Sequence, residues 1–392
     1  MNARTTQQQT AGLLLIGVIL VGATLRAPLT SVGALIPFIR DGLGISNTLA
    51  GSITTLPLLG FAFLSPFAPT LARRLGVQRT IAAALVLLLL GIALRSAGSV
   101  SALFAGTLFI GLGIAVGNVL IPAIVKINFP LKVGLITGLY AVGMNVMGAL
   151  GSGLSVPLYE AGLGWQGALA IWGVVAALAL VVWAPQLKAH QPYNPPATTS
   201  APSTPVWRSP LAWNVTLFMG SQSLIFYCLI TWMPDFLRSN GYTENAAGWM
   251  VFLMQFALIP VTFAVPMLAE KMKNQVPLAV FTALLFATGL LGLMFSSTFF
   301  YPLWAVLLGI GGGCAFSLSM MLFTLRTNSG QEAADLSGMA QSIGYLLAAL
   351  GPMLMGTLYD ISGGWLLPMG LLLLACGSIL LNGLAAGRGI TL

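Results

Sequence analysis

Apolar runs of about 20 residues recur along this chain from one end to the other, which is the length an α-helix needs to cross a bilayer. Only 6% of the 392 residues are charged, whereas soluble domains carry about 25%, so most of the surface cannot face water. Backbone groups inside a bilayer must be paired within the segment, which selects helices. We therefore expect an all-α membrane protein, and a soluble fold is excluded.

The apolar runs predict twelve helical spans, six on each side of a proline-rich segment. The predicted spans are 11–37, 48–70, 80–98, 101–126, 133–159, 165–184, 211–238, 246–269, 277–296, 300–326, 333–359 and 364–386. Residues 185–210 contain seven prolines in 26 positions and no apolar period, which is typical of an extended, flexible linker. The expected organisation is an N-terminal six-helix bundle over 1–184, the linker, and a C-terminal six-helix bundle over 211–392.

The distribution of basic residues predicts the orientation in the membrane. Twelve of the 16 lie at one side: Arg4, Arg73, Arg74, Arg79, Lys126, Lys132, Lys188, Arg208, Lys271, Lys273, Arg326 and Arg388. Arg40, Arg95 and Arg238 are assigned to the other side. By the positive-inside rule, both termini and the linker are expected in the cytoplasm. The basic residues form no stripe with interleaved aromatics, so the net charge of +8 does not indicate nucleic-acid binding.

The two halves of the chain repeat each other at a spacing of 200 residues. Residues 138–165 and 338–365 share nine identities in 28 positions, including Gly151 with Gly351 and Trp165 with Trp365. A parallel repeat of six spans is the sequence signature of the major facilitator architecture, in which two pseudo-symmetric bundles rock around a central site.

Polar residues are unevenly divided among the spans. The third, sixth, ninth and twelfth spans carry almost none and are expected to face lipid. A bilayer-facing amide has no partner, so polar side chains in the other spans should face protein or water. Each has two interpretations, a hydrogen bond between helices or contact with a transported solute. The candidate substrate-binding residues are Arg26, Thr30, Asn118, Tyr140, Asn145, Gln222, Tyr227, Gln255, Gln341 and Tyr345.

Arg26 is the basic residue that no loop explains. It lies in the middle of the first span, where a permanent charge costs about 2.5–3.5 kcal/mol on insertion scales and is usually functional. The eight acidic residues are placed at span ends or in loops, and His190 lies in the linker. We therefore expect the planar guanidinium to meet an anion in a wet cavity, rather than a structural carboxylate.

The same distribution bears on how transport is coupled. Proton-driven carriers commonly use an embedded Asp, Glu or His, and no span shows one in its middle. A facilitator, an exchanger, or a carrier whose solute brings its own proton is favoured.

Eight prolines are expected to interrupt the helices that move in such a carrier, and a tolerated kink with small-residue packing is the alternative at each position. They are Pro28, Pro57, Pro66, Pro69, Pro122, Pro260, Pro266 and Pro352.

Two other classes of function compete with a carrier. An enzyme would need a metal cluster or a nucleophile with its base, and the sequence shows neither. The three cysteines, Cys228, Cys314 and Cys376, lie in apolar segments and are expected to pack rather than to bind metal or form disulfides. A channel would be expected to show a filter or a charged ring. No metal or other cofactor is expected.

Three segments resemble a known family. The segment LRAPLTSVGALIPFIR, residues 25–40, resembles the first-helix signature of the cyanate porter family within the major facilitator superfamily. Residues 209–237 and 336–356 are similar to its 2-nitroimidazole transporter members. The resemblance implies a carrier in a bacterial inner membrane, usually a monomer, that moves a small planar anion or weak acid past Arg26. Efflux of a 2-nitroimidazole-like heterocycle, stacked on Tyr140, Tyr227 or Tyr345, is the alternative.

The loop after the second span departs from the superfamily pattern. The segment LARRLGVQR, residues 71–79, resembles the superfamily's loop motif but has Arg73 at a position where an aspartate is usual. The gating role that the resemblance would assign to that aspartate is therefore in doubt here.

Overall fold

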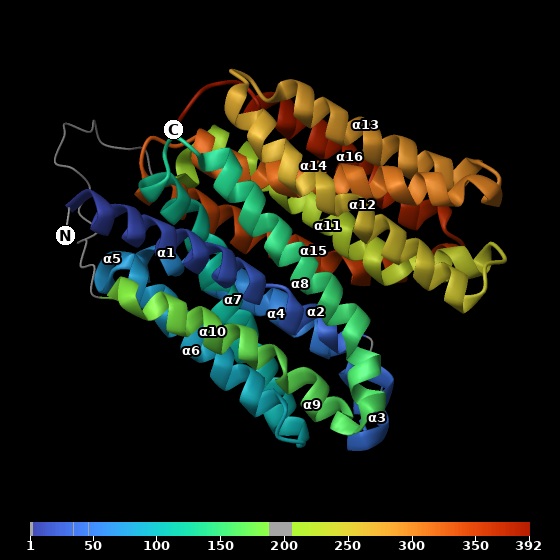
Figure 1. The fold of residues 1–392 in the computed structure, drawn as a ribbon. Coiled ribbons are helices and arrows are strands. Elements are labelled where there is room, and N and C mark those ends of the chain that lie inside the picture. The colour runs from blue at the N-terminus through green and yellow to red at the C-terminus, as the bar shows by residue number, and fades with distance from the viewer. Residues whose placement is uncertain (1–2, 34, 46, 188–205) are drawn as a thin grey trace. The chain divides into compact units, whose positions relative to one another are not determined.

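The computed structural model describes residues 3–33, 35–45, 47–187 and 206–392, and the regular elements in these ranges are all helices (Figure 1). By its internal contacts the chain divides into two units. The first comprises Met1–Leu131, Leu139–Ser200 and Ser329–Ala334, and the second comprises Lys132–Gly138, Ala201–Asn328 and Asp335–Leu392. Most of the predicted linker, residues 188–205, lies outside the described residues.

The helices follow the predicted spans closely. Those before the linker are α1 (Ala3–Thr24), α2 (Ala27–Gly33), α3 (Ile36–Leu43), α4 (Asn47–Leu64), α5 (Ala68–Leu75), α6 (Val77–Arg95), α7 (Val100–Asn128), α8 (Val133–Leu158), α9 (Gly164–Ala170) and α10 (Trp172–Trp183). Those after it are α11 (Pro210–Ser239), α12 (Glu244–Lys271), α13 (Val276–Phe295), α14 (Tyr301–Leu325), α15 (Gly330–Ser362) and α16 (Leu366–Ala386).

Within the described ranges, ten stretches are long and apolar enough to cross a membrane, and the bent pair Ser52–Leu64 and Ala68–Leu75 makes an eleventh. One of the ten, Val133–Ala170, contains α8 and α9 together. Gly162 (φ 91°) and Gly164 (φ 61°) lie at the junction, in the left-handed region that favours glycine, so the chain turns there. The sixth predicted span therefore begins with α9 and ends in the shorter apolar stretch Trp172–Leu187, and the twelve-span prediction agrees with the helices found.

The first span is interrupted just before the seven-residue helix α2. Proline lacks an N–H group and its ring clashes with the carbonyl four residues earlier, which for Pro28 is that of Thr24. Helix α1 ends at Thr24, and regular hydrogen bonding resumes when Leu29 and Thr30 donate to the carbonyl of Arg26. Pro28 thus explains why Arg26 lies in a turn.

The expectation that all eight prolines interrupt helices is wrong for five of them. Helices continue through Pro57, Pro122, Pro260, Pro266 and Pro352. A helix can absorb a missing backbone donor when neighbouring helices support the freed carbonyl, and this is common in membrane proteins.

Glycines bring the helices of the first unit into close contact. A Cβ atom on Gly106 of α7 would lie 2.5 Å from the carbonyl oxygen of Gly91 in α6, and one on Gly113 would lie 2.8 Å from that of Ala84. Without hydrophobic attraction between spans, such small residues let helices gain packing contacts. Helices α6 and α7 therefore form a tight hairpin, and α10 covers α6 (Figure 1).

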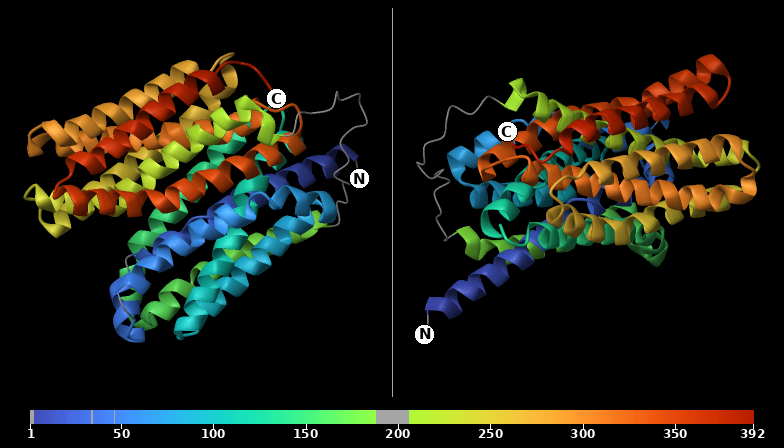
Figure 2. Two further views of the ribbon diagram at one scale, coloured as in Figure 1. Left: turned by 180° about the vertical axis from the view of Figure 1, so that it is seen from behind. Right: turned by 90° about the horizontal axis from the view of Figure 1, so that it is seen from above.

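The second unit uses the same device. A Cβ atom on Gly313 of α14 would lie 2.7 Å from the carbonyl oxygen of Leu258 in α12. On its other side, α14 packs against α13, which in turn packs against α16 (Figure 2). Ser221 donates to Ser378 at 2.8 Å and thereby joins α11 to α16.

The repeated glycines Gly151 and Gly351 occupy matching positions in their own units. A Cβ atom on Gly151 of α8 would lie 2.9 Å from the carbonyl oxygen of Ala27 in α2. One on Gly351 of α15 would lie 3.0 Å from Cγ of Leu224 in α11. In each unit the glycine therefore allows close approach to the helix that opens that half of the chain.

Candidate functional site

The guanidinium of Arg26 is held by an amide. Its Nη1 donates a 2.5 Å hydrogen bond to Oδ1 of Asn145 on α8, 119 residues away. A Cβ atom on Gly148 would lie 2.9 Å from Cγ of Arg26. The aliphatic stem of the arginine therefore lies against a glycine, and its guanidinium reaches one turn further to the amide; the residue as a whole is partly exposed.

Asn145 is oriented by its own helix. Its Nδ2 donates to the carbonyl of Ala141 at 2.9 Å, and the residue is 6% exposed. With the donor end of the amide occupied in this way, the acceptor end faces the guanidinium. An amide oxygen carries no net charge, so this contact orients Arg26 without neutralising it.

Thr30 lies one turn beyond Arg26 and ties α2 to α8. Its hydroxyl donates to the carbonyl of Gly148 at 2.7 Å, and Ser155 donates to the carbonyl of Ser31 at 2.9 Å. The close approach that Gly151 allows makes both bonds possible. Thr30 therefore holds α2 against α8 and so helps to position Arg26.

Tyr140 and Asn118 flank the turn from two helices. Tyr140 of α8 packs close to Gly22, since a Cβ atom on that glycine would lie 3.1 Å from Cβ of Tyr140. Tyr140 is 3% exposed, and its hydroxyl has no hydrogen-bond partner among the described residues. Asn118 of α7 is partly exposed and follows Gly117, which packs against Leu25. The structure thus brings Arg26, Thr30 and Asn145 into one bonded group, with Tyr140 packed against Gly22 and Asn118 next in sequence to Gly117, which packs against Leu25.

The five candidates of the second unit fall into two sets. Gln222 and Gln341 are buried, and each donates through Nε2 to a serine hydroxyl of its own helix, Ser223 or Ser337, at 2.8 Å. Tyr345 is also buried, at 7% exposure. Tyr227 and Gln255 are partly exposed. The buried glutamines are therefore placed to support the interior of this unit.

The sequence analysis missed Arg95. Arg95 was counted only among the basic residues of one membrane side and was not a candidate residue, whereas it is the last residue of α6 and is 1% exposed. Its Nη1 donates to the carbonyl of Pro28 in α2 at 2.6 Å. Ser96 is the C-cap of this helix, and the left-handed Gly98 follows it. A glycine just after the end of an apolar run is the sequence signal that the helix continues to about Arg95.

The three cysteines are buried and free. Among the described residues, no three His, Cys, Asp or Glu side chains gather as they would to hold a metal ion.

Helices long and apolar enough to span a membrane, with an oriented arginine in the interrupted first span, define a polytopic helical membrane protein. The chain is a member of the Major Facilitator Superfamily, whose sequence model matches residues 14–352.

Its relatives are transporters matched over most of their length. It is 46% identical to the "Uncharacterized transporter YycB" of Bacillus subtilis (strain 168), over 96% of this chain and 93% of that one. It is 43% identical to the "2-nitroimidazole transporter" of Escherichia coli (strain K12), over 96% and 95%. With the "Cyanate transport protein CynX" of the same organism the identity is 28%, over 90% and 92%.

The fold is likewise that of a solved transporter. A crystal structure of a double-tryptophan XylE mutant matches with a TM-score of 0.76 over 96% of this chain and 95% of that one, at 12% identity. The predicted family and fold class are therefore confirmed.

Proposed function

We propose that this protein is a secondary carrier of a small planar anion or weak acid, of the cyanate type, with Arg26 as the solute's countercharge. The observation that carries the proposal is the hydrogen bond from Arg26 to Asn145 at the interruption of the first span. A charge held there costs insertion free energy, about 2.5–3.5 kcal/mol, that a purely packing residue would avoid. A guanidinium also presents planar donors that match a flat, delocalised anion.

We propose that the solute moves by alternating access; membership of the superfamily, in which repeats rock around a site near the middle of the membrane, supports this. The residues proposed to line the solute path in the first unit are Arg26, Asn145, Tyr140 and Asn118. Tyr227 and Gln255 are proposed for the second unit because they are its partly exposed candidates. We further propose a monomer in a bacterial inner membrane with both termini in the cytoplasm, as the distribution of basic residues predicts.

A second candidate, efflux of a 2-nitroimidazole-like heterocycle, is favoured by the higher identity to the 2-nitroimidazole transporter, 43% against 28% for the cyanate protein. A nitro group presents two acceptor oxygens in the plane of its ring, so Arg26 could bind it as it would bind an anion. Of the three tyrosines considered for stacking, Tyr227 has a partly exposed ring, whereas Tyr140 and Tyr345 are buried.

The decisive experiment is uptake into proteoliposomes of labelled cyanate and of 2-nitroimidazole, by the wild type and by Arg26→Gln. Arg40→Gln is the matched control, because Arg40 is exposed and bonded to Asp41. The anion carrier is supported if Arg26→Gln loses saturable cyanate transport while the wild type and Arg40→Gln retain it. Transport of 2-nitroimidazole but not of cyanate selects the second candidate. An unchanged KM for both solutes in Arg26→Gln overturns the role of Arg26, and single-channel currents would replace the carrier with a channel.

A further inference from the structure

Arg95 is a fully buried cation whose role the proposed function does not include. Burying a charge is costly unless hydrogen bonds compensate for lost water. The bond from its Nη1 to the carbonyl of Pro28 is 2.6 Å long, whereas its Nε and Nη2 have no partner among the described residues. The Pro28 carbonyl is therefore the acceptor on which this buried charge depends.

The backbone at Arg95 has little freedom to move. A Cβ atom on Gly106 of α7 would lie 2.7 Å from Cα of Arg95, so α6 and α7 are in direct backbone contact at this level. The guanidinium thus links a rigid two-helix hairpin to the short helix α2.

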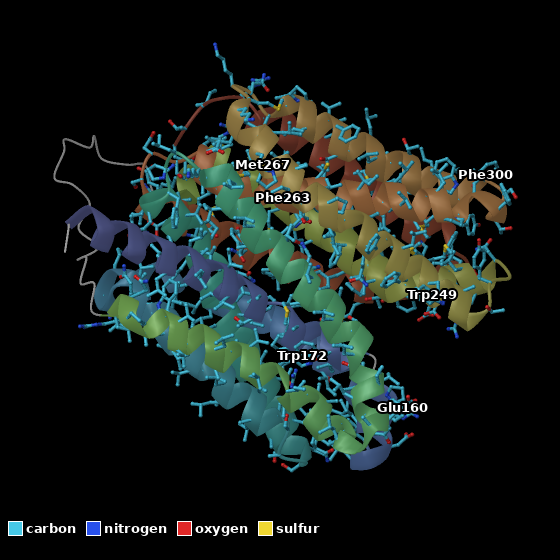
Figure 3. All side chains as sticks on the ribbon, in the orientation of Figure 1. Glu160, Trp172, Trp249, Phe263, Met267 and Phe300 are labelled. Carbon is cyan, nitrogen blue, oxygen red and sulfur yellow. The ribbon has the colours of Figure 1, made fainter. Side chains whose placement is uncertain are left out.

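The surroundings on the α10 side reinforce this dependence. Gly173 packs against Ile92, one turn before Arg95, and the adjacent Trp172 is 6% exposed (Figure 3). The Nε and Nη2 atoms of Arg95 have no partner among the described residues, so no second acceptor replaces the Pro28 carbonyl. Moving α2 away from Arg95 would therefore leave a buried charge without compensation.

Helix α2 is bound on its other side by α8, through Thr30 to the carbonyl of Gly148 and through Ser155 to that of Ser31. It follows a turn rather than a continuous helix, so α1 alone does not determine its direction. The bonds to α6 and α8 do so instead. Arg26 lies in the turn at the start of α2, two residues before Pro28, so its position depends on the position of α2.

We propose that Arg95 is a positioning residue: by holding the Pro28 carbonyl it fixes α2 and thereby aims Arg26 at the transported solute. The inference rests on the proposed function, because it assigns Arg95 an effect on solute affinity through Arg26. A charged donor is required, since a neutral side chain would leave a weaker bond to the carbonyl.

The first test needs no solute. Hydrogen–deuterium exchange of the backbone amides of residues 27–33 is compared in the wild type, Arg95→Met and Arg95→Lys, with Arg40→Met as the matched control. We expect faster exchange in Arg95→Met, partial return to wild-type exchange in Arg95→Lys, and no change in Arg40→Met. Unchanged exchange in Arg95→Met would overturn the proposal. If Arg95→Met does not fold, Arg95→Gln takes its place, with the same expected direction and the same overturning result.

The second test is a double-mutant cycle in proteoliposomes with cyanate and 2-nitroimidazole as probes. Arg95→Met should raise KM about tenfold for the transported probe, and Arg95→Lys should recover part of that loss. The increase should shrink in an Arg26→Lys background, which keeps a charge for the solute but lacks the planar fork that α2 aims. Equal increases in both backgrounds would show that Arg95 supports the fold alone. If Arg26→Gln itself leaves KM unchanged while exchange in 27–33 still depends on Arg95, the proposed function fails and the attachment of α2 by Arg95 remains.

Discussion

Nη1 of Arg26 lies 2.5 Å from Oδ1 of Asn145, and this contact joins the interrupted first span to α8. The amide orients the guanidinium and leaves its charge in place. The effects of substitutions around this pair follow from the orientation that the amide gives to this charge.

Replacing Asn145 by aspartate should weaken anion transport while sparing the fold. A carboxylate at this position would pair with Arg26 and compete with the solute for the guanidinium, so we expect KM to rise at least about tenfold. Asn382→Asp is the matched control, because Asn382 also donates to the carbonyl four residues earlier, at 2.8 Å, but on α16. Uptake kinetics in proteoliposomes measure both, and an unchanged KM in Asn145→Asp would contradict the role of the pair.

Replacing Gly151 by alanine should push α2 away from α8. The new methyl group would lie 2.7 Å from Oγ1 of Thr30 and 2.9 Å from the carbonyl oxygen of Ala27, which is backbone and cannot rotate aside. We expect a loss of about 1–3 kcal/mol, seen as a lower thermal transition in detergent. Gly153→Ala on the same helix is the control, since its Cβ atom would meet nothing within 4 Å. Equal transitions in the two variants would show that this contact is not tight.

Tyr140→Phe should separate packing from solute contact. The hydroxyl of Tyr140 is buried without a partner among the described residues, so removing it should leave the thermal transition unchanged or raise it. If the hydroxyl contacts the solute, as proposed, KM should nevertheless increase severalfold. Tyr159→Phe, whose ring stacks on Phe38 at 4.0 Å, serves as the control. A Tyr140→Phe variant with wild-type transport would remove Tyr140 from the solute path.

Arg326→Met should destabilise the second unit. Arg326 was assigned to the cytoplasmic charges, but it is 3% exposed and donates to the carbonyl oxygens of Ala386 at 2.6 Å and Gly387 at 3.0 Å, and to the side chain of Gln275. Its loss leaves buried acceptors unpaired, at about 1–3 kcal/mol each. We expect a clearly lower thermal transition, whereas Arg388→Met, at an exposed position, should resemble the wild type. A lower thermal transition in Arg388→Met than in Arg326→Met would refute the structural role of Arg326.

The sequence identified those candidate residues that can be recognised within one span. Arg26, Thr30 and Asn145 were identified because a polar side chain in mid-span has few acceptable environments. Arg95 and Arg326 were counted only as charges at span ends, because hydropathy places a charge at the end of an apolar run without showing whether that end is buried. The distinction depends on the neighbouring helix, as the contact between Gly106 and Arg95 shows.

Hydropathy and the repeat determined the fold class and the twelve spans, because each span must pair its own backbone groups and bury its length in lipid without help from the rest of the chain. Only the tertiary structure decided which polar groups meet. Asn145 is 119 residues from Arg26, and Arg95 is 67 from Pro28. Such pairs depend on the rotation of each helix about its axis and on the glycines that set helix-to-helix distance. These properties belong to the packed helices together, so no single span carries them.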